Sequence, residues 1–246
     1  MSRRSSSVVV MERALAQMAA DIELACGATA IADDEALWTP RPAQPGRGLR
    51  TPDGRLLSPQ QMAIESWADE LLFGGSLGGG KSDLLLGLAL TQHRNSIIFR
   101  YEFKQVRGAL GLIDRSMEIV GLRGELSNFR WRNLPGGRSL EFGGARDMKD
   151  ALKWKGHPHD LKAFDEVTEI AETVYRFLIA WLRTSVAGQR VRVVATSNPP
   201  MTEEGKWVTR YWAPWLSPTH PNPAAAGELR WFVVGADGKD QEVPGP

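Results

Sequence analysis

The sequence predicts an α/β fold with a mainly parallel central sheet flanked by helices, and three observations predict it. Short apolar runs alternate with segments of helical spacing between residues 58 and 200. A glycine-rich loop at 74–82 stands between an apolar run and an apolar helical segment. The acidic pair Asp165-Glu166 follows a later apolar run. Alternation of strand and helix favours parallel strands, because each crossover helix covers one face of the sheet.

A capped helix is expected to lead into this alternation. Ser58 suits the N-cap, Pro59 the first helical position and Gln61 the return bond of a capping box. The elements expected after it are a strand at 70–74, a helix over 81–93, a strand at 96–100, a helix over 103–119, a hairpin of 128–133 with 138–143, a strand at 160–164, a helix over 171–184, a strand at 190–195 and a terminal hairpin from residue 229.

Composition divides the chain into three parts. Residues 1–57 combine helical spacing over 8–31 with a proline-rich stretch, which predicts a helical N-terminal appendage and a linker. Residues 58–200 form the predicted core. Residues 201–246 are rich in proline and tryptophan and predict a small C-terminal subdomain or linker.

The loop fits the pattern G-x4-G-K-[ST], which is typical of a P-loop. Glycines let backbone N–H groups approach phosphate oxygens without a Cβ clash. Lys81 can reach the β- and γ-phosphates, and the Ser82 hydroxyl can bind Mg²⁺. The alternative is a glycine-rich loop with an incidental lysine, but the strand before it and the helix after it favour a P-loop that binds ATP or GTP together with Mg²⁺. The loop residues expected to bind nucleotide are Gly75, Ser76, Leu77, Gly78, Gly79, Gly80, Lys81 and Ser82.

Two further motifs predict hydrolysis. Asp165 is expected to hold Mg²⁺ together with Ser82, and Glu166 is expected to act as the catalytic base beside the catalytic Lys81. An ordinary acidic turn is the alternative for this pair. Ser197 and Asn198 follow the last core strand and could sense the γ-phosphate. A loop opening set by turn chemistry is the alternative for them.

Composition excludes several classes of protein. The net charge of +1 predicts no general affinity for nucleic acid, so any DNA contact must come from a local patch. The single cysteine, Cys26, excludes an internal disulfide and a cysteine-based zinc site. No apolar stretch approaches the ~20 residues of a membrane span, which predicts an intracellular protein without a membrane partner.

These motifs, in this order, resemble the ATPase portion of the large terminase subunit of tailed phages. The segment from Ser58 to Gln61 is similar to a glutamine segment on the adenine side, so Gln60 is expected to bind nucleotide. The other segments that carry the resemblance are 73–83, 99–101, 105–108, 155–169, 196–200, 205–208 and 213–216, of which 155–169 is the most similar.

The resemblance implies a P-loop ATPase that drives double-stranded DNA into a procapsid. It implies portal protein and a small terminase subunit as partners, a homo-oligomeric ring on the procapsid, and action in the cytoplasm of an infected or prophage-carrying bacterium. Two rival readings remain at this point, a helicase- or recombinase-like ATPase and an ATP-gated docking module with low turnover.

The chain departs from the family in two ways. Leu77 stands where many members carry an arginine, so an arginine from a neighbouring subunit could complete the site. The candidates for that trans residue are Arg100, Arg107, Arg138, Arg146 and Lys155. The family's nuclease domain is also expected to be absent, since the chain ends at Pro246, and no nuclease activity is expected from it.

Overall fold

A seven-stranded sheet lies at the centre of the protein. The computed structural model describes residues 36–44, 48–51, 53–75, 78–107, 111–236 and 238–245, so the helices expected over 8–31 and Cys26 lie outside the described residues. The strand order is β3-β9-β8-β4-β7-β6-β5. The first five of these strands run parallel, and β6 and β5 extend the sheet in antiparallel fashion. The predicted fold class is therefore confirmed.

The elements follow the chain in an alternating order. The strands of the central sheet are β3 (Glu70–Gly74), β4 (Asn95–Arg100), β5 (Glu125–Ser127), β6 (Arg130–Leu134), β7 (Arg138–Gly144), β8 (Leu161–Phe164) and β9 (Arg192–Ser197). The helices between and before them are α2 (Pro59–Glu65), α3 (Lys81–Thr91), α4 (Phe103–Arg107), α5 (Leu112–Val120), α6 (Met148–Leu152) and α7 (Glu172–Ile179).

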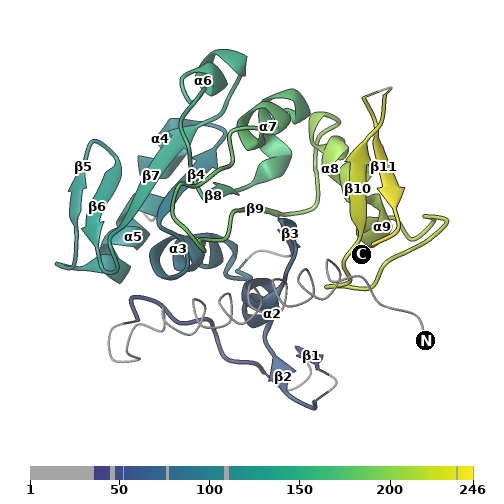
Figure 1. The fold of residues 1–246 in the computed structure, drawn as a ribbon, viewed down its shortest axis with the longest axis horizontal. Helices are drawn as coiled ribbons and strands as arrows, with labels where there is room; N and C mark the ends of the chain where they lie inside the picture. Colours follow the sequence, from purple (N-terminus) through teal and green to yellow (C-terminus); the bar gives the residue numbers. More distant parts are fainter. Residues whose placement is uncertain are drawn as a thin grey trace, which may run out of the picture.

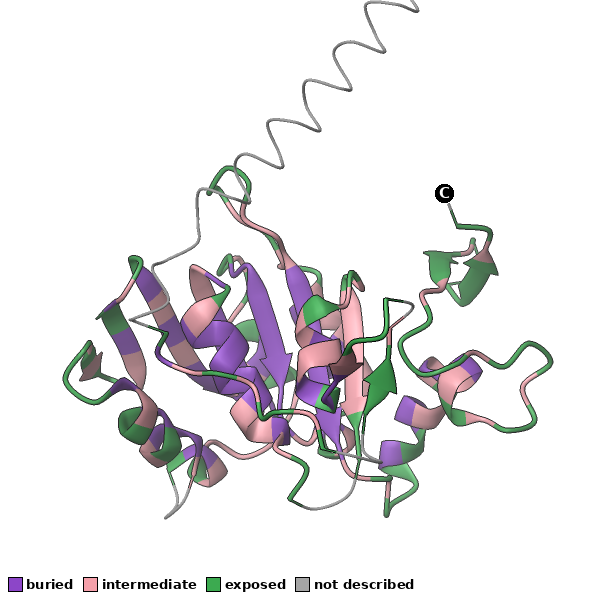
Figure 2. Cartoon of the chain, turned by 90° about the horizontal axis from the view of Figure 1, so that it is seen from below, coloured by how far each residue is buried: buried purple, intermediate pink, exposed green. Residues whose placement is uncertain are grey.

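Helices cover both faces of the sheet (Figure 1). Side chains alternate between the faces along each strand, as the two-residue period of a strand requires. On β4, Ile98 packs into the core that contains α3 and α5, whereas Ile97 and Phe99 pack into the core that contains α7. The central strands are accordingly buried along most of their length (Figure 2).

Three expected elements differ in detail. The helix expected over 103–119 is two helices, α4 and α5. The hairpin of β6 and β7 is confirmed, but β7 also pairs in parallel with β4 and so belongs to the central sheet. The helix expected over 171–184 ends at Ile179. The chain then turns, and Leu182 forms an isolated parallel β-bridge with His159.

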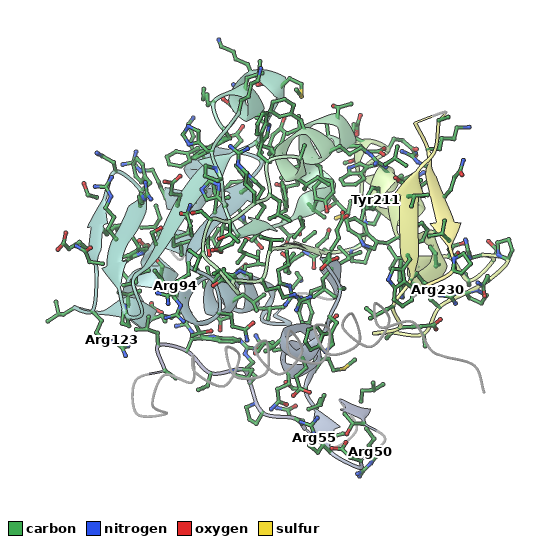
Figure 3. The ribbon with its side chains drawn as sticks, in the orientation of Figure 1. Arg50, Arg55, Arg94, Arg123, Tyr211 and Arg230 are labelled. Atoms are coloured by element: carbon green, nitrogen blue, oxygen red, sulfur yellow. The ribbon has the colours of Figure 1, made fainter. Side chains whose placement is uncertain are left out.

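The C-terminal segment packs beside α7. It contains α8 (Trp207–Tyr211), α9 (Ala213–Leu216) and the expected hairpin of β10 (Trp231–Val234) with β11 (Asp240–Val243). Tyr211 lies next to this hairpin (Figure 3) and donates a hydrogen bond to Glu70 on β3 at 3.1 Å. Arg176 on α7 forms an ion pair with Asp240 on β11. Burial raises the pKa of the Glu70 carboxyl, and hydrogen bonds from Tyr175 and Tyr211 oppose that shift.

A short two-stranded ribbon precedes α2. It consists of β1 (Leu49–Arg50) and β2 (Leu56–Leu57). Ser58 caps α2, and the predicted capping box with Gln61 is present in full. None of the helices in the described parts of the chain has the length and apolar character needed to cross a bilayer.

Candidate nucleotide-binding site

The glycine-rich loop leaves the carboxyl end of β3 and enters the first turn of α3. Gly78 and Gly80 have φ angles of 75° and 73°, a left-handed conformation that favours glycine. The Gly75 N–H donates to the Ser197 carbonyl at 3.2 Å, so the loop is tied to the end of β9. Ser76 and Leu77 lie outside the described residues. The positive end of the eleven-residue helix α3 faces the loop, which suits an anion.

Lys81 folds back over the loop. Its side chain is 7% exposed, and Nζ donates to the Gly75 carbonyl at 3.3 Å and to Asn198 Oδ1 at 2.8 Å. The ammonium group is therefore held above the loop by neutral acceptors, which a phosphate oxygen could replace with a stronger, charge-assisted bond.

Asp165 lies just past the end of β8, and side chains alone surround its carboxylate. Ser82 Oγ lies 3.1 Å from both carboxylate oxygens, and Thr196 Oγ1 donates to Oδ1 at 3.0 Å. Arg100 Nε donates to Oδ2 at 2.9 Å. Asp165 is fully buried, so this arrangement of donors is the source of its solvation.

The pairing of Ser82 with Asp165 fits a magnesium ion. Mg²⁺ prefers oxygen ligands and usually takes one or two carboxylates, phosphate oxygens and several waters. Ser82 and Asp165 both line a cavity of about 200 Å³ that is bordered by Arg100 and by the start of α5. Within the described residues, no group of three or more His, Cys, Asp or Glu side chains gathers into an all-protein metal site. A site shared with phosphate is the arrangement that these residues suit.

Glu166 is held in an unusual backbone conformation. Its φ and ψ angles are both 57°, a left-handed conformation that costs a non-glycine residue on the order of 1 kcal/mol. Asn198 donates to its carboxylate twice, from the backbone N–H and from Nδ2, each at 3.2 Å. The same Asn198 side chain accepts from Lys81, so one amide joins the loop lysine to the candidate base.

Ser197 bonds to the segment that follows the acidic pair. Its hydroxyl lies 2.8 Å from Thr168 Oγ1 and donates to the Asn198 carbonyl at 2.5 Å. Thr168 belongs to the short 3₁₀ helix Val167–Glu169 directly after Glu166. The end of β9 therefore contacts the P-loop on one side and the acidic turn on the other.

Gln60 lies beside the loop with both ends of its amide engaged. Its Nε2 donates to the Gly80 carbonyl at 2.8 Å, and its Oε1 accepts from the Arg41 backbone N–H at 2.7 Å. Arg41 in turn donates from Nη1 to the Gly78 carbonyl at 3.2 Å. Motif reasoning did not identify Arg41, because the proline-rich segment around it predicts only a linker.

The five candidates for a trans residue lie in different surroundings. Arg100 is part of the site in its own chain, through Asp165. Arg138 is 8% exposed and donates to the carbonyls of Thr91 and Pro135, so it is not free to reach a neighbouring subunit.

The remaining three candidates lie nearer the surface. The Arg107 guanidinium lies over the ring of Phe129, 4.7 Å from its centroid. Arg146 is exposed and lies 3.6 Å from Asp147. Lys155 is exposed in the turn after α6.

Thr196 is a site residue that sequence reasoning missed. It lies on β9 and bonds to Asp165, while Ser197 and Asn198 were identified instead. The signal was available, because the carboxyl ends of parallel strands meet at one edge of a sheet and the hydroxyl of Thr196 is at that end of its strand.

Among known proteins, the structure of this chain is similar to structures of large terminases from phages. No family model matches the chain, and no curated protein matches it. Its structure is similar to that of the large terminase from a thermophilic bacteriophage, with a TM-score of 0.43 and 18% identity over 58% of this chain and 36% of that chain. A complex of the same phage protein with ADP gives a TM-score of 0.41 and 18% identity, over 57% of this chain and 35% of that chain.

The large terminase of bacteriophage HK97 is also similar, with a TM-score of 0.44 and 10% identity over 59% of this chain and 32% of that chain. The chain therefore spans about a third of the length of these solved chains. They are of the class that the sequence motifs resemble. At these scores and identities the similarity assigns no activity to this chain.

Proposed function

We propose that this chain is the ATP-hydrolysing domain of a viral DNA-packaging motor. The observation that supports it best is the bridge made by Asn198 between Lys81 and Glu166, next to the pair of Ser82 and Asp165. Loop lysine, acidic pair and polar strand end come from distant parts of the sequence and meet at the carboxyl edge of one parallel sheet. Ligands bind at this edge in open α/β sheets.

The residues divide the work of phosphoryl transfer among them. Lys81 would leave Gly75 and Asn198 and neutralise charge on the β- and γ-phosphates. Glu166 would orient the attacking water and accept its proton, while Asn198 holds the carboxylate in place. Mg²⁺, held by Ser82 and Asp165, would supply further charge neutralisation on the phosphate oxygens. Arg100, which donates to Asp165, could keep that bond or instead stabilise the negative charge that develops on the phosphate.

Asn198 would then couple the state of the nucleotide to the rest of the chain. Its amide contacts both Lys81 and Glu166, so departure of the γ-phosphate would change both bonds. Residues 199–206 lead directly from Asn198 to α8 and the C-terminal segment. We infer that Ser197 and Asn198 transmit hydrolysis to that segment, which would move bound DNA.

The motor role, as opposed to a general ATPase role, rests on the order of the sequence motifs. Double-stranded DNA, a portal protein, a small terminase subunit and a homo-oligomeric ring are the partners that this role implies, in the cytoplasm of a bacterial host. A cavity of about 220 Å³ supports a contact with DNA phosphates. Arg130, Arg132, Glu141 and Trp154 are among the residues that line it, on and beside the antiparallel extension of the sheet. Arg130 forms an ion pair with Glu141 at 2.8 Å, so Arg132 is the guanidinium that would meet a phosphate.

The proposal is tested by phosphate release from ATP and by direct binding of ADP. Lys81→Ala should lower ADP affinity and turnover at least about a hundredfold, because the loop loses its only lysine. Lys149→Ala, on the exposed face of α6, is the matched control and should behave as the unaltered protein. Full turnover by Lys81→Ala would overturn the ATPase assignment.

The motor role is tested in the same assay with double-stranded DNA and across protein concentration. Stimulation by DNA and a rate per chain that rises with concentration would support a ring that shares its sites between subunits. Turnover that responds to neither would contradict the motor role while leaving the ATPase site intact.

A further inference from the structure

The segment of residues 37–44 is packed against the nucleotide site. Leu37 is 8% exposed and belongs to the core that contains α3. The indole of Trp38 lies so close to Gly87 of α3 that a Cβ on this glycine would come within 2.2 Å of it. The start of the segment 37–44 is therefore fixed by core packing.

Gln60 fixes the middle of this segment at Arg41. Its amide is 2% exposed, accepts from the Arg41 N–H and donates to the Gly80 carbonyl. Each end of the amide makes one of the two hydrogen bonds that it can make, and because the residue is 2% exposed, little of its remaining donor and acceptor is open to a nucleobase. Gln60 is therefore suited to hold Arg41 against the loop and is poorly suited to read the base itself.

The Arg41 guanidinium lies outside the phosphate cradle of the loop. Phosphates are bound by loop N–H groups, whereas Arg41 donates to a loop carbonyl, that of Gly78. Its Nη2 is 3.8 Å from Asp83 at the start of α3, and the side chain remains 60% exposed. The planar guanidinium has five donors, and although it lies close to Gly80, most of the side chain is open to solvent.

We propose that Arg41 lays its guanidinium plane on the base of the bound nucleotide, and that Gln60 is a positioning residue that holds Arg41 there. This inference rests on the proposed function, since it takes the nucleotide site as given. A guanidinium stacks on a flat π-system through its charge and its plane together. Stacking of this kind does not read the hydrogen-bonding edge of the base, so adenine and guanine nucleotides should use it alike.

The test compares ADP and GDP with inorganic tripolyphosphate by calorimetric titration. Arg41→Ala should lower the affinity for both nucleotides about tenfold and leave the affinity for tripolyphosphate unchanged. The backbone N–H remains in this variant, so its bond to Gln60 is kept and the loss reports the guanidinium alone. Arg41→Lys should not restore affinity, because an ammonium group has no plane to stack.

Arg50→Ala is the matched control. Arg50 also donates from Nη1 to a glycine carbonyl, that of Gly54 at 3.3 Å, but in the β1–β2 ribbon and away from the P-loop. It should bind all three ligands as the unaltered protein does. Both variants should unfold near the temperature of the unaltered protein without nucleotide, because both side chains are exposed.

The role of Gln60 is tested by a double-mutant cycle. Gln60→Ala should lower the affinity for ADP. In the Arg41→Ala background the same change should lower that affinity by a smaller factor, because part of its effect passes through Arg41. Gln60→Glu should be worse than Gln60→Ala, since a carboxylate oxygen would then face the Gly80 carbonyl. Equal effects of Gln60→Ala in both backgrounds would overturn its role as a positioning residue for Arg41.

Two other results would overturn the inference. Arg41→Ala that binds ADP as well as the unaltered protein would exclude the contact. Equal weakening of ADP and tripolyphosphate would indicate a phosphate contact or a damaged loop. If the unaltered protein bound no nucleotide, the proposed function would fail as well, whereas an unaltered protein that binds ADP beside an unaffected Arg41→Ala would remove this inference alone.

Discussion

The two ends of β8 each carry a buried aspartate, and the two carboxylates are held in different ways. Asp160 precedes the strand and accepts backbone N–H groups of Arg94 and Asn95 at 3.1 and 3.0 Å, while His93 Nδ1 lies 3.2 Å away. Asp165 follows the strand, and among the described residues its carboxylate accepts only from the side chains of Ser82, Thr196 and Arg100. Both aspartates are completely buried.

The difference distinguishes a carboxylate held by the backbone from one held by side chains, and we propose that only the second serves the nucleotide site. Backbone donors are fixed by the fold, so Asp160 cannot exchange them without moving β4. Side-chain donors can rotate, so Asp165 can exchange a hydroxyl or guanidinium for a cation at little cost to the fold. Burial does not distinguish the two aspartates, whereas the type of donor does.

The largest expected effect is on activity at Asp165. Asp165→Asn should reduce phosphate release at least about a hundredfold, because the neutral amide is a poor magnesium ligand. The thermal unfolding midpoint should change little, since Ser82 and Thr196 can also bond to an amide oxygen. Loss of folding in this variant, measured by circular dichroism, would contradict the distinction drawn between the two aspartates.

The opposite pattern is expected for Asp160. Asp160→Ala should lower the free energy of unfolding by about 1–3 kcal/mol, because two half-buried N–H groups lose their acceptor. The folded fraction should still bind ADP with unchanged affinity. Chemical denaturation followed by titration of the folded protein tests both statements, and normal stability with lost ADP binding would reverse the assignments.

A third buried charge on β8 lies between the two aspartates and has no hydrogen-bond partner among the described residues. Lys162 is fully buried, and burial lowers its pKa to about 8. Because this value lies below the ordinary 10.5, the unfolded chain binds more protons between the two, and stability should rise with pH across that window.

Replacement of this lysine should therefore stabilise the protein. At pH 7, Lys162→Met should raise the free energy of unfolding by about 1–3 kcal/mol, because it removes a buried, unpaired charge. The gain should shrink as the pH approaches 10. Lys155→Met, at an exposed position, is the control and should show no such pH dependence. A destabilised Lys162→Met at pH 7 would indicate that Glu141, the opposite charge that acts on it, compensates the cost of burial.

The position of Asp165 and Glu166 at the end of β8 could be predicted from the sequence, because they follow a short apolar run. The order of strand, loop and helix around Lys81 is also local in sequence, and the structure has that order. The pairing of β7 with β4 could not be predicted from the sequence. The turn at 135–137 indicates only that β7 pairs with β6, and it carries no signal for a second partner strand.

Contacts between segments distant in sequence account for what was missed. Arg41 reaches the loop only because Trp38 packs on Gly87 and Gln60 binds the Arg41 backbone, and neither contact leaves a local pattern. Gln60 was expected to bind nucleotide from a resemblance, and the structure places its amide between Arg41 and Gly80. Its part in nucleotide binding stays a proposal, as does that of the sensor pair.

Single-turnover kinetics of Glu166→Gln show whether this site hydrolyses ATP with Glu166 as the base. Glu166→Gln keeps the shape of the side chain and an oxygen that can accept from Asn198, but it cannot take a proton from water. We expect ATP affinity within about twofold of the unaltered protein and phosphate release at least about a hundredfold slower in a single turnover. Phosphate release at the unaltered rate, with ATP bound equally well, would contradict it.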